Sequence, residues 1–563
     1  MLLARKVSAL SSAVGVMVMH GASKVAANDW NTSYINPVMP GWHSDPSCIF
    51  VPQLDNTTFC TTSSFLEFPG CTIYASKDLV NWRVASNAFN RQEQVPGALT
   101  ANIGSNLETG ILASTLRYHD DKFHLITTWL DSFGGQTRIE LRMFIGTDPY
   151  DEKTWGDSIL IPNIGAAIDP DVFWEEDGRM VVTVGASVIA ENGPIQAYYV
   201  ELDGTTARNT SEVIDLWAGT GGSYPEGPHL YRKDGYYYLL IAEGGTGLPH
   251  TVSMARSKTL QGPWEGNPAN PVLTNYNTPE YYQTVGHADL FQDAESNWWG
   301  MGHATRGGPD LYRAGIFPLA REAVLFPVSW PEGEFPTAKP VRGYMQGPLP
   351  LPTLQVRGQG EFVDVSEAVD FLPGSELPRN WKYVRAPRRP EDFNVSPDGH
   401  FGSLRLTASA SNITGSPTVN ATTGLTLITR LQTSTLFDFS FDIAQDFSDA
   451  EGDEAGMTAL KYNDQHVDMG IVNMKNEGDD AKVGKFIRVR ATAIDLVNAT
   501  IPEPVILPVP ERWTNDLIRM RLSAVSPTHF EFSAGPASRP KEARSLLVFS
   551  SELVTGSGID SGK

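Results

Sequence analysis

Apolar and polar residues alternate in short runs from Asn36 to Pro340, and turn-forming residues separate these runs. A period of two predicts β-strands, and this half shows no sustained helical period. Neighbouring runs flank short turn sequences, which predicts five β-hairpins. The predicted turns lie at Asp55-Asn56, Asp120-Asp121, Asp177-Gly178, Asp234-Gly235 and Ser296-Asn297.

A six-residue repeat that ends in an aromatic residue leads into each hairpin. After the first, the repeats start roughly 55–60 residues apart, which is comparable to known propeller repeats. They begin at Asp45, Ala113, Asp169, Glu226 and Gly286. Radial repeats place equivalent positions around one axis. The sequence therefore predicts an all-β fold that begins with a five-bladed β-propeller, with three carboxyl groups converging at one end.

Three tryptophans follow the outer strands of these units: Trp82, Trp155 and Trp264. We expect them to pack between blades rather than to bind sugar. The repeat ends after about Tyr344, where Gly347-Pro-Leu-Pro-Leu-Pro352 is unsuited to the interior of a sheet.

Short alternating strands follow the break, and they predict a C-terminal antiparallel β-sandwich. The predicted strands are 404–408, 425–431 and 437–443. The expected organisation is a signal peptide (1–27), the propeller (28–345), a linker (346–361) and the sandwich (362–563).

The N-terminus has the pattern of an export signal. Arg5 and Lys6 precede a short apolar run from Val7 to Met19, and small residues at 25–27 suit cleavage. Seven N-x-S/T acceptors agree with a secreted, extracellular glycoprotein: Asn31, Asn56, Asn209, Asn394, Asn412, Asn420 and Asn498. The later sequence contains no segment that resembles a membrane span.

Net charge and cysteine spacing argue against certain partners and against a zinc site. The net charge of −22 argues against nucleic acid and anionic membranes as partners. Cys48, Cys60 and Cys71 do not have zinc-ligand spacing, and one disulfide with one free thiol suits an oxidising compartment. The pairing stays open, with Cys60–Cys71 favoured.

Converging carboxyl groups suit the cleavage of a glycosidic bond. One group must be protonated to donate to the leaving oxygen, and the other must be ionised to activate water or to attack. A third carboxyl nearby would raise the donor's pKa. Each Asp-Pro on its own is equally compatible with a simple turn.

Three motifs together resemble the signatures of glycoside hydrolase family 43. They are Trp42-His-Ser-Asp-Pro-Ser47, Ile168-Asp-Pro-Asp-Val-Phe173 and Pro225-Glu-Gly-Pro-His229. The likeness continues to Gly286-His287, to 299–306, to Pro318-Leu-Ala-Arg-Glu322 and to Pro327-Val-Ser-Trp330. The resemblance implies a five-bladed propeller that hydrolyses glycosides with inversion. It assigns Asp45 as general base, Glu226 as general acid, and Asp169 as the residue that tunes and orients the acid.

The resemblance also suggests weaker site residues. Arg306 matches an arginine that binds substrate hydroxyls, although a surface ion pair is an alternative. His287 matches a histidine near the propeller centre, sometimes beside a hydrated calcium ion, although a buried structural histidine is an alternative. Trp42, Phe65 and Trp129 either line the sugar pocket or pack in the core. No cofactor is required, and no metal beyond that calcium is expected.

The C-terminal half resembles the sandwich of two-domain β-xylosidases and α-L-arabinofuranosidases through 381–385 and 454–457. This likeness predicts an exo-acting enzyme that releases terminal xylose or arabinose from xylan or arabinoxylan fragments. Departures from the family are Ser44, where proline is usual, and Leu112-Ala113-Ser114 in the second blade. The sequence after Gly556 is shorter than in related sandwiches, so we expect a C-terminus that lacks a last strand.

Three other functions fit less of the sequence. One is an arabinan-cutting enzyme of the same family, with endo or exo action. Another is a fructan or sucrose hydrolase, whose Asn-Asp-Pro-Asn signature does not occur in this sequence. The last is a carbohydrate-binding propeller without catalysis, which the three intact carboxyl groups disfavour.

Overall fold

The structure is a computed structural model, and most of the chain is described. The described residues are 33–96, 109–133, 136–185, 192–409, 413, 425–462, 464–476, 479–493, 496 and 499–555. Within these residues the regular structure is almost entirely β-strand, with a single α-helix, α1 (Gly308–Arg313). The all-β prediction is therefore confirmed, although the repeat pattern did not predict this short helix.

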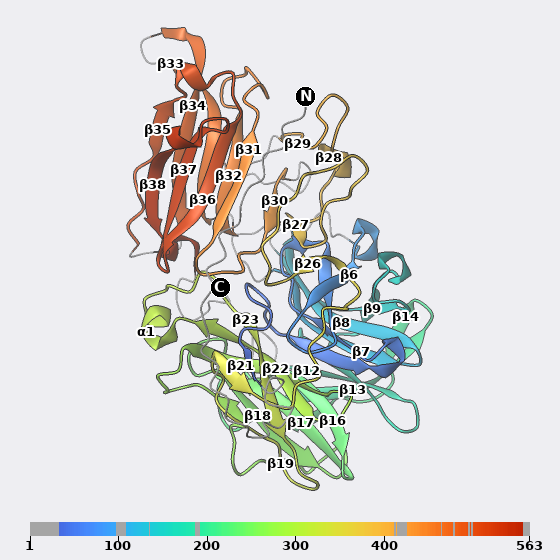
Figure 1. The fold of residues 1–563 in the computed structure, drawn as a ribbon. Helices are drawn as coiled ribbons and strands as arrows, with labels where there is room; N and C mark the ends of the chain where they lie inside the picture. Colours follow the sequence, from blue (N-terminus) through green and yellow to red (C-terminus); the bar gives the residue numbers. More distant parts are fainter. Residues whose placement is uncertain are drawn as a thin grey trace, which may run out of the picture.

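Five antiparallel sheets follow one another along the described part of residues 47–338, as the lower half of Figure 1 shows. The first contains β2 (Ser47–Val51), β3 (Thr57–Thr61), β5 (Gly70–Ser76) and β6 (Arg83–Phe89). The second contains β7 (Gly110–His119), β8 (Lys122–Phe133), β9 (Gln136–Gly146) and β10 (Ile159–Ile161). The third contains β11 (Ile168–Trp174), β12 (Met180–Gly185), β13 (Ile195–Asp203), β14 (Thr206–Asn209) and β15 (Ile214–Trp217).

The last two sheets also pair their first four strands in chain order. The fourth contains β16 (Glu226–Lys233), β17 (Tyr236–Glu243), β18 (Thr251–Ser257), β19 (Glu265–Gly266) and β20 (Leu273–Thr274). The fifth contains β21 (Tyr282–Gln292), β22 (Trp298–Arg306), β23 (Glu322–Ser329) and β24 (Thr337–Ala338). The first strands contact one another in the cycle β2, β7, β11, β16, β21 and back to β2.

The five predicted hairpin turns fall between the first and second strands of these sheets, as expected. Asp55, Asp120, Gly178, Gly235 and Ser296 have positive φ at these turns. Asp, Gly, Asn and Ser are turn residues because they tolerate or stabilise this backbone geometry. The packing tryptophans also agree with the prediction, since Trp82 and Trp155 are fully buried and Trp264 packs partly buried against a core cluster.

The disulfide differs from the favoured prediction. Cys48 bonds to Cys60, and Cys71 is a free, buried thiol. Cys48 and Cys60 are direct neighbours across β2 and β3, whereas Cys60 faces Tyr74 on β5. Cys71 lies three residues before Tyr74 on that strand, or about 10 Å away, which is beyond the reach of a disulfide.

The chain between the two halves is bound to the first sheet rather than free. β26 (Gln359–Phe362) adds to the edge of that sheet at β6. β27 (Trp381–Val384) pairs with β4 (Glu67–Phe68) on one side and with β30 (Ile428–Arg430) on the other. The buried Lys382 Nζ on β27 donates to Thr72 Oγ1 at 2.9 Å and to Asn87 Oδ1 at 2.5 Å. Burial lowers the pKa of Lys382 to about 8, although Glu67 opposes this shift.

Two four-stranded antiparallel sheets form the described C-terminal part, seen at the upper left of Figure 1. One contains β31 (Asp438–Ile443), β36 (Ile518–Ser526), β37 (His529–Pro536) and β38 (Arg544–Ser550). The other contains β32 (Glu454–Tyr462), β33 (Gln465–Asn476), β34 (Asp479–Ala493) and β35 (Val505–Pro508). They share one hydrophobic core, which includes Val467, Ile487, Met520 and Phe532. The first of these strands begins at Asp438, and the domain limits given above stay predictions.

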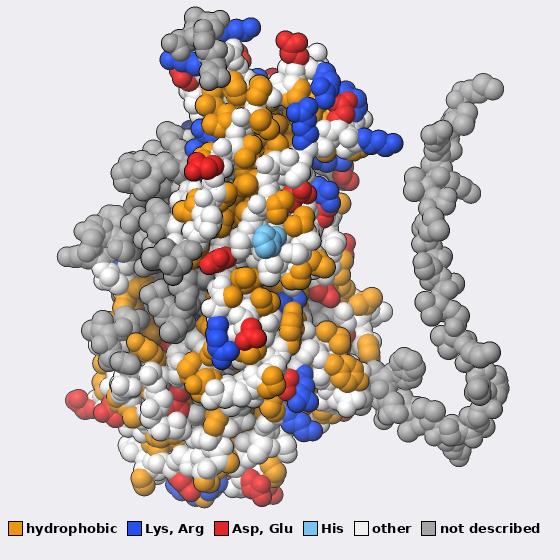
Figure 2. All heavy atoms as spheres, turned by 90° about the vertical axis from the view of Figure 1, so that its left-hand side faces the viewer, with side chains coloured by type: hydrophobic (Ala, Val, Ile, Leu, Met, Phe, Trp, Pro, Cys, Tyr) orange, Lys and Arg blue, Asp and Glu red, His pale blue; other side chains and the backbone are white. Residues whose placement is uncertain are grey.

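The face drawn in Figure 2 carries both hydrophobic and charged side chains. Figure 2 shows hydrophobic side chains gathered over the upper half of one face, with lysine and arginine at its upper right. Among the described residues, Asn56 and Asn209 are exposed and Asn394 is half-buried. The predicted signal peptide, Asn31, Asn412, Asn420, Asn498 and the sequence after residue 555 lie outside the described residues. No helix within the described ranges has the length and apolar character that crossing a membrane requires.

Candidate active site

The backbone is irregular at or just before the start of the innermost strand of each sheet, that is β2, β7, β11, β16 and β21. This irregularity turns one residue of each sheet away from the hydrogen-bonded pairing. The residues at this point have φ between 44° and 58°: Asp45, Ala113, Asp169, Gly227 and His287. In β7, β11, β16 and β21 the pairing register also shifts there. Such bulges re-aim side chains, and strained backbone of this kind is concentrated at functional sites.

This register corrects the stacking of the repeats in the last two units. Ile168 pairs across its hairpin as Glu226 and Gly286 do in theirs, so Asp169 is equivalent to Gly227 and His287. The repeats of these two units were offset by one residue because the local sequence carries no signal for the bulge. The fifth position of the ring is therefore occupied by His287, and Glu226 lies one residue before the bulge.

Asp45 is buried and surrounded by donors from several strands. Ser63 Oγ donates to its Oδ2 at 2.5 Å, and Arg321 donates to Oδ1 at 3.4 Å. His303 Nδ1 lies 3.1 Å from Oδ1. Burial alone would raise the pKa of Asp45, but His287, Arg321 and His303 together hold it well below its usual range. The carboxylate is thus ionised, as an acceptor of a proton from water must be.

Asp169 has the opposite electrostatic balance. Burial raises its pKa and the negative charge of Asp45 adds to the rise, against the lowering effects of His287 and the Gly227 N–H. The Gly227 N–H donates to Oδ2 of Asp169 at 3.2 Å. Because Gly227 directly follows Glu226, this bond connects Asp169 to the backbone of the predicted acid. Glu226 itself is partly exposed at the start of β16.

His287 lies between these groups. Its Nδ1 is 3.5 Å from Oδ1 of Asp45, and a Cβ placed on Gly227 would be only 2.9 Å from its Nε2. The absence of a side chain at Gly227 therefore lets the two strands approach. His287 influences the pKa of both Asp45 and Asp169 electrostatically. These relationships bring residues 45, 169, 226 and 287 to one end of the ring.

The surroundings of His287 do not form a calcium site from protein side chains alone. Calcium prefers six to eight oxygen ligands, whereas the group that His287 presents to Asp45 is an imidazole nitrogen. No cluster of three or more His, Cys, Asp or Glu ligands occurs in the part of the chain that is described. Calcium held through water beside His287 stays a prediction, and no chemical step below uses a metal.

Arg306 is held by a buried carboxylate. Its Nε and NH2 donate to Oε2 and Oε1 of Glu322 at 2.5 and 2.7 Å, and NH1 donates to Thr435 Oγ1 at 3.2 Å. The side chain keeps 18% of its exposure, whereas that of Glu322 has none. The bidentate pair fixes the guanidinium plane, and the bond to Thr435 connects it to the C-terminal half.

The three candidate aromatic residues differ in environment. Trp42 is half-buried and stacks on Phe65, with ring centroids 4.7 Å apart. Arg321, which contacts Asp45, also lies over the Phe65 ring at 5.6 Å. Trp129 is buried in a core cluster, and its Nε1 donates to Asp131 at 2.7 Å. Phe65 is therefore linked to Asp45 through Arg321, and Trp42 packs on Phe65, while Trp129 has the contacts of a core residue.

Four residues around the site were not singled out from the sequence: Ser63, His303, Arg321 and Glu322. Arg321 and Glu322 stand within the family-like motif Pro318-Leu-Ala-Arg-Glu322, so their neighbourhood was recognised without their contacts. Ser63 carries no motif signal, and His303 lies within the family-like stretch 299–306 without being singled out. Both approach Asp45 only once the strands are assembled. His303 is fully buried, and burial lowers its pKa to about 4.

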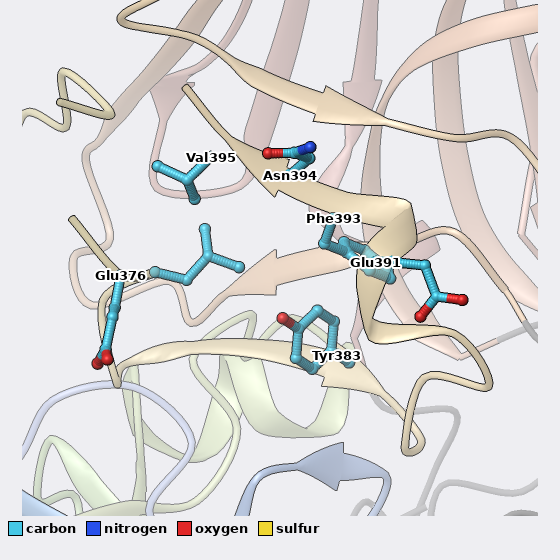
Figure 3. Close-up of a pocket in the computed structure, with 7 residues that line it drawn as sticks. Glu376, Tyr383, Glu391, Phe393, Asn394 and Val395 are labelled. Carbon is cyan, nitrogen blue, oxygen red and sulfur yellow. The ribbon is translucent and has the colours of Figure 1, made fainter. Parts of the chain in front are cut away.

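A cavity of ≈ 420 Å³ lies away from the carboxyl groups. Figure 3 shows its lining from the segment around β27 and β28 (Phe393–Val395), which includes Tyr383, Phe393 and Asn394. None of the three candidate catalytic residues lines it. The chemistry of the converging carboxyl groups, rather than cavity size, therefore identifies the candidate site.

Comparison with known proteins places this geometry in a family. A family model described as glycosyl hydrolases family 43 matches residues 34–336. The chain is 30% identical to a xylosidase/arabinosidase of Butyrivibrio fibrisolvens, over 82% of this chain and 84% of that protein. It is also 30% identical to a non-reducing end α-L-arabinofuranosidase of Bacteroides ovatus, over 93% of this chain and 89% of that protein.

Solved structures extend the likeness across both halves. The Bacteroides ovatus protein described as "Xyloglucan PUL GH43B" is 26% identical, with a TM-score of 0.75 over 93% of this chain and 92% of that one. A xylan β-1,4-xylosidase from Bacillus halodurans, 23% identical, has the same fold with a TM-score of 0.74 over 92% of each chain. These findings define a glycoside hydrolase. The chain belongs to glycosyl hydrolase family 43.

Proposed function

We propose that this enzyme is an inverting, exo-acting glycosidase that releases terminal xylose, arabinose or both from xylan-derived chains. The observation that supports this most directly is the meeting of Asp45, Asp169 and Glu226 at one end of five cyclically arranged sheets. The relatives' names mention xylosidase and arabinofuranosidase activities, which favours pentose substrates. The proposed partners are xylan or arabinoxylan fragments.

The proposed reaction is a single displacement. Asp45 accepts a proton from water as the water oxygen bonds to the anomeric carbon. Glu226 donates its proton to the glycosidic oxygen as the bond from that oxygen to the anomeric carbon breaks. The products are a sugar of inverted anomeric configuration and a shortened chain with a new hydroxyl. Asp169 acts through its bond to Gly227 N–H, which orients Glu226, and through its charge.

The architecture proposed for this activity is a closed five-bladed β-propeller followed by a β-sandwich. The cycle of contacts between first strands supports closure, and the shared core of the two C-terminal sheets supports the sandwich. Thr435, and the carbonyl oxygen of Gln432 close to Gly41, bring the C-terminal half beside Arg306 and Trp42. Because the C-terminal half walls this side of the candidate site, a pocket that takes chain ends is favoured over an open groove.

We also propose that the enzyme is secreted and glycosylated. The apolar run at 7–19, the acceptor sites and the disulfide between Cys48 and Cys60 support export to an oxidising compartment. A direct test is N-terminal sequencing and glycan analysis of the protein from the medium of an expressing cell. Retention of residues 1–27 in that protein would contradict the export signal.

The catalytic assignment is tested with Glu226→Gln and Asp45→Asn. Each variant should lose turnover by about 10²–10⁴-fold while its circular dichroism spectrum stays that of the parent enzyme. NMR of the first-formed product on aryl-xyloside or aryl-arabinofuranoside should show inversion. Net retention, or near-parental turnover in either variant, would exclude the proposed mechanism.

One alternative activity has specific support. A relative is named an arabinofuranosidase, so arabinan-derived chains are a second candidate substrate class. The chain lengths of early products from arabinan and arabinoxylan distinguish the two. Release of monomers from arabinoxylan alone supports the main proposal, and early long fragments from arabinan support the endo-acting alternative.

A further inference from the structure

A second ring of equivalent positions lies directly after the bulges. Each innermost strand resumes regular pairing at the residue that follows its bulge, and Ser47 begins β2 in the same way. These residues are Ser47, Thr115, Asp171, His229 and Asp289. All five are buried and polar. Such a layer is unusual, because the interior of a protein is normally apolar unless polar groups are paired.

Arg117 connects four of these five positions. Its NH1 donates to Oδ2 of Asp289 at 2.7 Å and to Ser47 Oγ at 3.2 Å. Its NH2 donates to Oδ2 of Asp171 at 2.8 Å and lies 3.0 Å from Nδ1 of His229. One planar guanidinium therefore contacts strands β2, β11, β16 and β21 from its place on β7.

Further bonds complete the network. Ser47 Oγ donates to Asp289 Oδ2, and Tyr231 Oη donates to Asp289 Oδ1, both at 2.7 Å. The backbone N–H of Leu116 donates to Ser47 Oγ, and that of Leu290 donates to Tyr231 Oη. These bonds fix the side chains and the backbone of neighbouring strands relative to one another, so the network extends beyond the charged groups.

The network is adjacent to the proposed catalytic residues in sequence. Asp45 precedes Ser47 by two residues, Asp169 precedes Asp171 by two, and Glu226 precedes His229 by three. His287 likewise precedes Asp289 by two. Arg117 comes from the second sheet, whose ring residue Ala113 offers no polar side chain to the site. That sheet instead contributes the cation that contacts the other four.

The energetic cost of this arrangement argues for a role beyond packing. Two carboxylates and most of a guanidinium are removed from water, which carries a large desolvation penalty, and apolar residues of similar volume are often at least as stabilising. Arg117 holds the pKa of Asp289 at about 2 against the effect of burial, so that carboxylate is charged. Small displacements of reacting groups, on the other hand, cost large factors in rate.

We propose that Arg117 is a positioning residue, which sets the relative placement of Asp45, Asp169 and Glu226 by binding the polar layer directly after them. This inference rests on the function proposed above. The guanidinium fork makes contacts in two directions from one plane, which the single ammonium of lysine does not reproduce. The layer is then a second, deeper part of the same catalytic site.

The test compares Arg117→Met with the double variant Arg117→Met/Asp289→Asn. The single variant leaves two carboxylates facing no cation, so its Tm should fall. The double variant has one carboxylate and no cation, which restores the parental net charge of the Arg117, Asp171 and Asp289 group. Its Tm should therefore recover part of the loss, since only one unpaired carboxylate remains, while kcat on aryl-xyloside or aryl-arabinofuranoside stays about 10²-fold low and KM changes little.

A gentler variant covers the case in which both of these fail to fold. Arg117→Lys keeps the charge, so its Tm should stay near that of the parent, while kcat should fall about 10-fold because the fork is lost. Recovery of kcat together with Tm in the double variant, or parental kcat in Arg117→Lys, would show that the network serves the fold alone and would overturn the proposal.

Parallel assays separate this outcome from failure of the proposed function. Glu226→Gln and Asp45→Asn are measured on the same substrate. If both are inactive while the Arg117 variants keep parental kcat, only the positioning role is wrong. If Glu226→Gln keeps parental turnover, the assignment of the acid is wrong, and with it the site that Arg117 is proposed to position.

Discussion

The backbone N–H of Gly227 donates a 3.2 Å hydrogen bond to Oδ2 of Asp169. This contact joins the starts of β11 and β16, and it places the buried aspartate one residue from Glu226. The same carboxyl group has a raised pKa because of burial and the nearby charge of Asp45. Asp169 is therefore placed to orient the proposed acid while being electrostatically unfavourable to the folded protein.

Asp169→Asn should lower kcat and raise thermal stability at neutral pH. The native pKa is raised above the unfolded value, so the native carboxyl causes no loss of stability below the unfolded pKa. The loss develops as pH rises through the native pKa. Asparagine removes it, so Tm should rise at pH 7 and stay unchanged in acid. Turnover should fall by about 10²-fold, because orientation and tuning of the acid are lost.

Calorimetry at several pH values and steady-state kinetics measure these two effects. Asp177→Asn is the control, since Asp177 is an exposed turn residue at the opposite end of β11. A lower Tm for Asp169→Asn at pH 7 would contradict the electrostatic argument. Parental kcat would contradict the orienting role.

His303→Phe should move the acidic limb of the kcat/KM profile to higher pH. The groups that face Asp45 are His287 from β21, His303 from β22, Arg321 before β23 and Ser63 after β3, with Asp169 contributing charge. His303 is one of the contacts that lower the pKa of Asp45. Without it, the base should require a higher pH to ionise.

The same change should weaken stability at neutral pH. Asp45 has a lowered native pKa, so its contribution to stability is present above the unfolded pKa and is lost as pH falls through the native pKa. His124→Phe is a matched control, because His124 is also buried with a pKa lowered to about 4, and its ring packs against Trp174. An unmoved acidic limb in His303→Phe would exclude His303 from setting the state of Asp45.

Local chemistry explains which parts of this protein could be predicted from sequence. The hairpin at Asp177-Gly178 follows from turn residues between alternating strands, so it needs no tertiary information. The pairing of β27 with β4 joins residues more than 300 positions apart by a few backbone bonds, which no local pattern indicates. No local pattern indicates the bulges at Gly227 and His287 either. For this reason the sequence repeats of these two units were aligned one residue too early.

The candidate site also divides into residues that the sequence predicts and contacts that it does not predict. Asp45, Asp169 and Glu226 are recognisable because each stands in a motif of its own. The contacts that set their states come from residues such as Ser63 and His303, whose approach depends on how the strands assemble. Arg306 and Glu322 both lie in stretches that resemble the family, but their pairing was not predicted, because an ion pair across β22 and β23 depends on strand register.

Glu322→Gln should raise KM more than it lowers kcat. Glu322 holds Arg306 in a bidentate pair and accepts from the Gly41 N–H at 3.0 Å, next to Trp42. If Arg306 binds substrate hydroxyls, loss of the charged partner should raise KM about 10-fold, which corresponds to about 1.4 kcal/mol. Glu322→Ala should also destabilise the fold by about 3–5 kcal/mol, because a buried charge pair is broken.

Kinetics on short xylo-oligosaccharides and thermal unfolding measure these effects. Glu332→Gln is the control, since Glu332 is exposed on the loop after β23. Unchanged KM in Glu322→Gln with a lowered Tm would assign the Arg306–Glu322 pair to stability alone. It would also remove Arg306 from the substrate-binding residues.

The disulfide offers a test of the first sheet itself. Cys48 and Cys60 close a loop of sequence separation 12, and a link of this length is worth about 3 kcal/mol in the chain-entropy account. Cys48→Ala should therefore lower Tm, whereas Cys71→Ala should leave the link intact. Peptide mass spectrometry without reduction should join the peptides that contain Cys48 and Cys60 in the parent and in Cys71→Ala. A link between Cys60 and Cys71 would require β5 to slide along β3, and would contradict the register of that sheet.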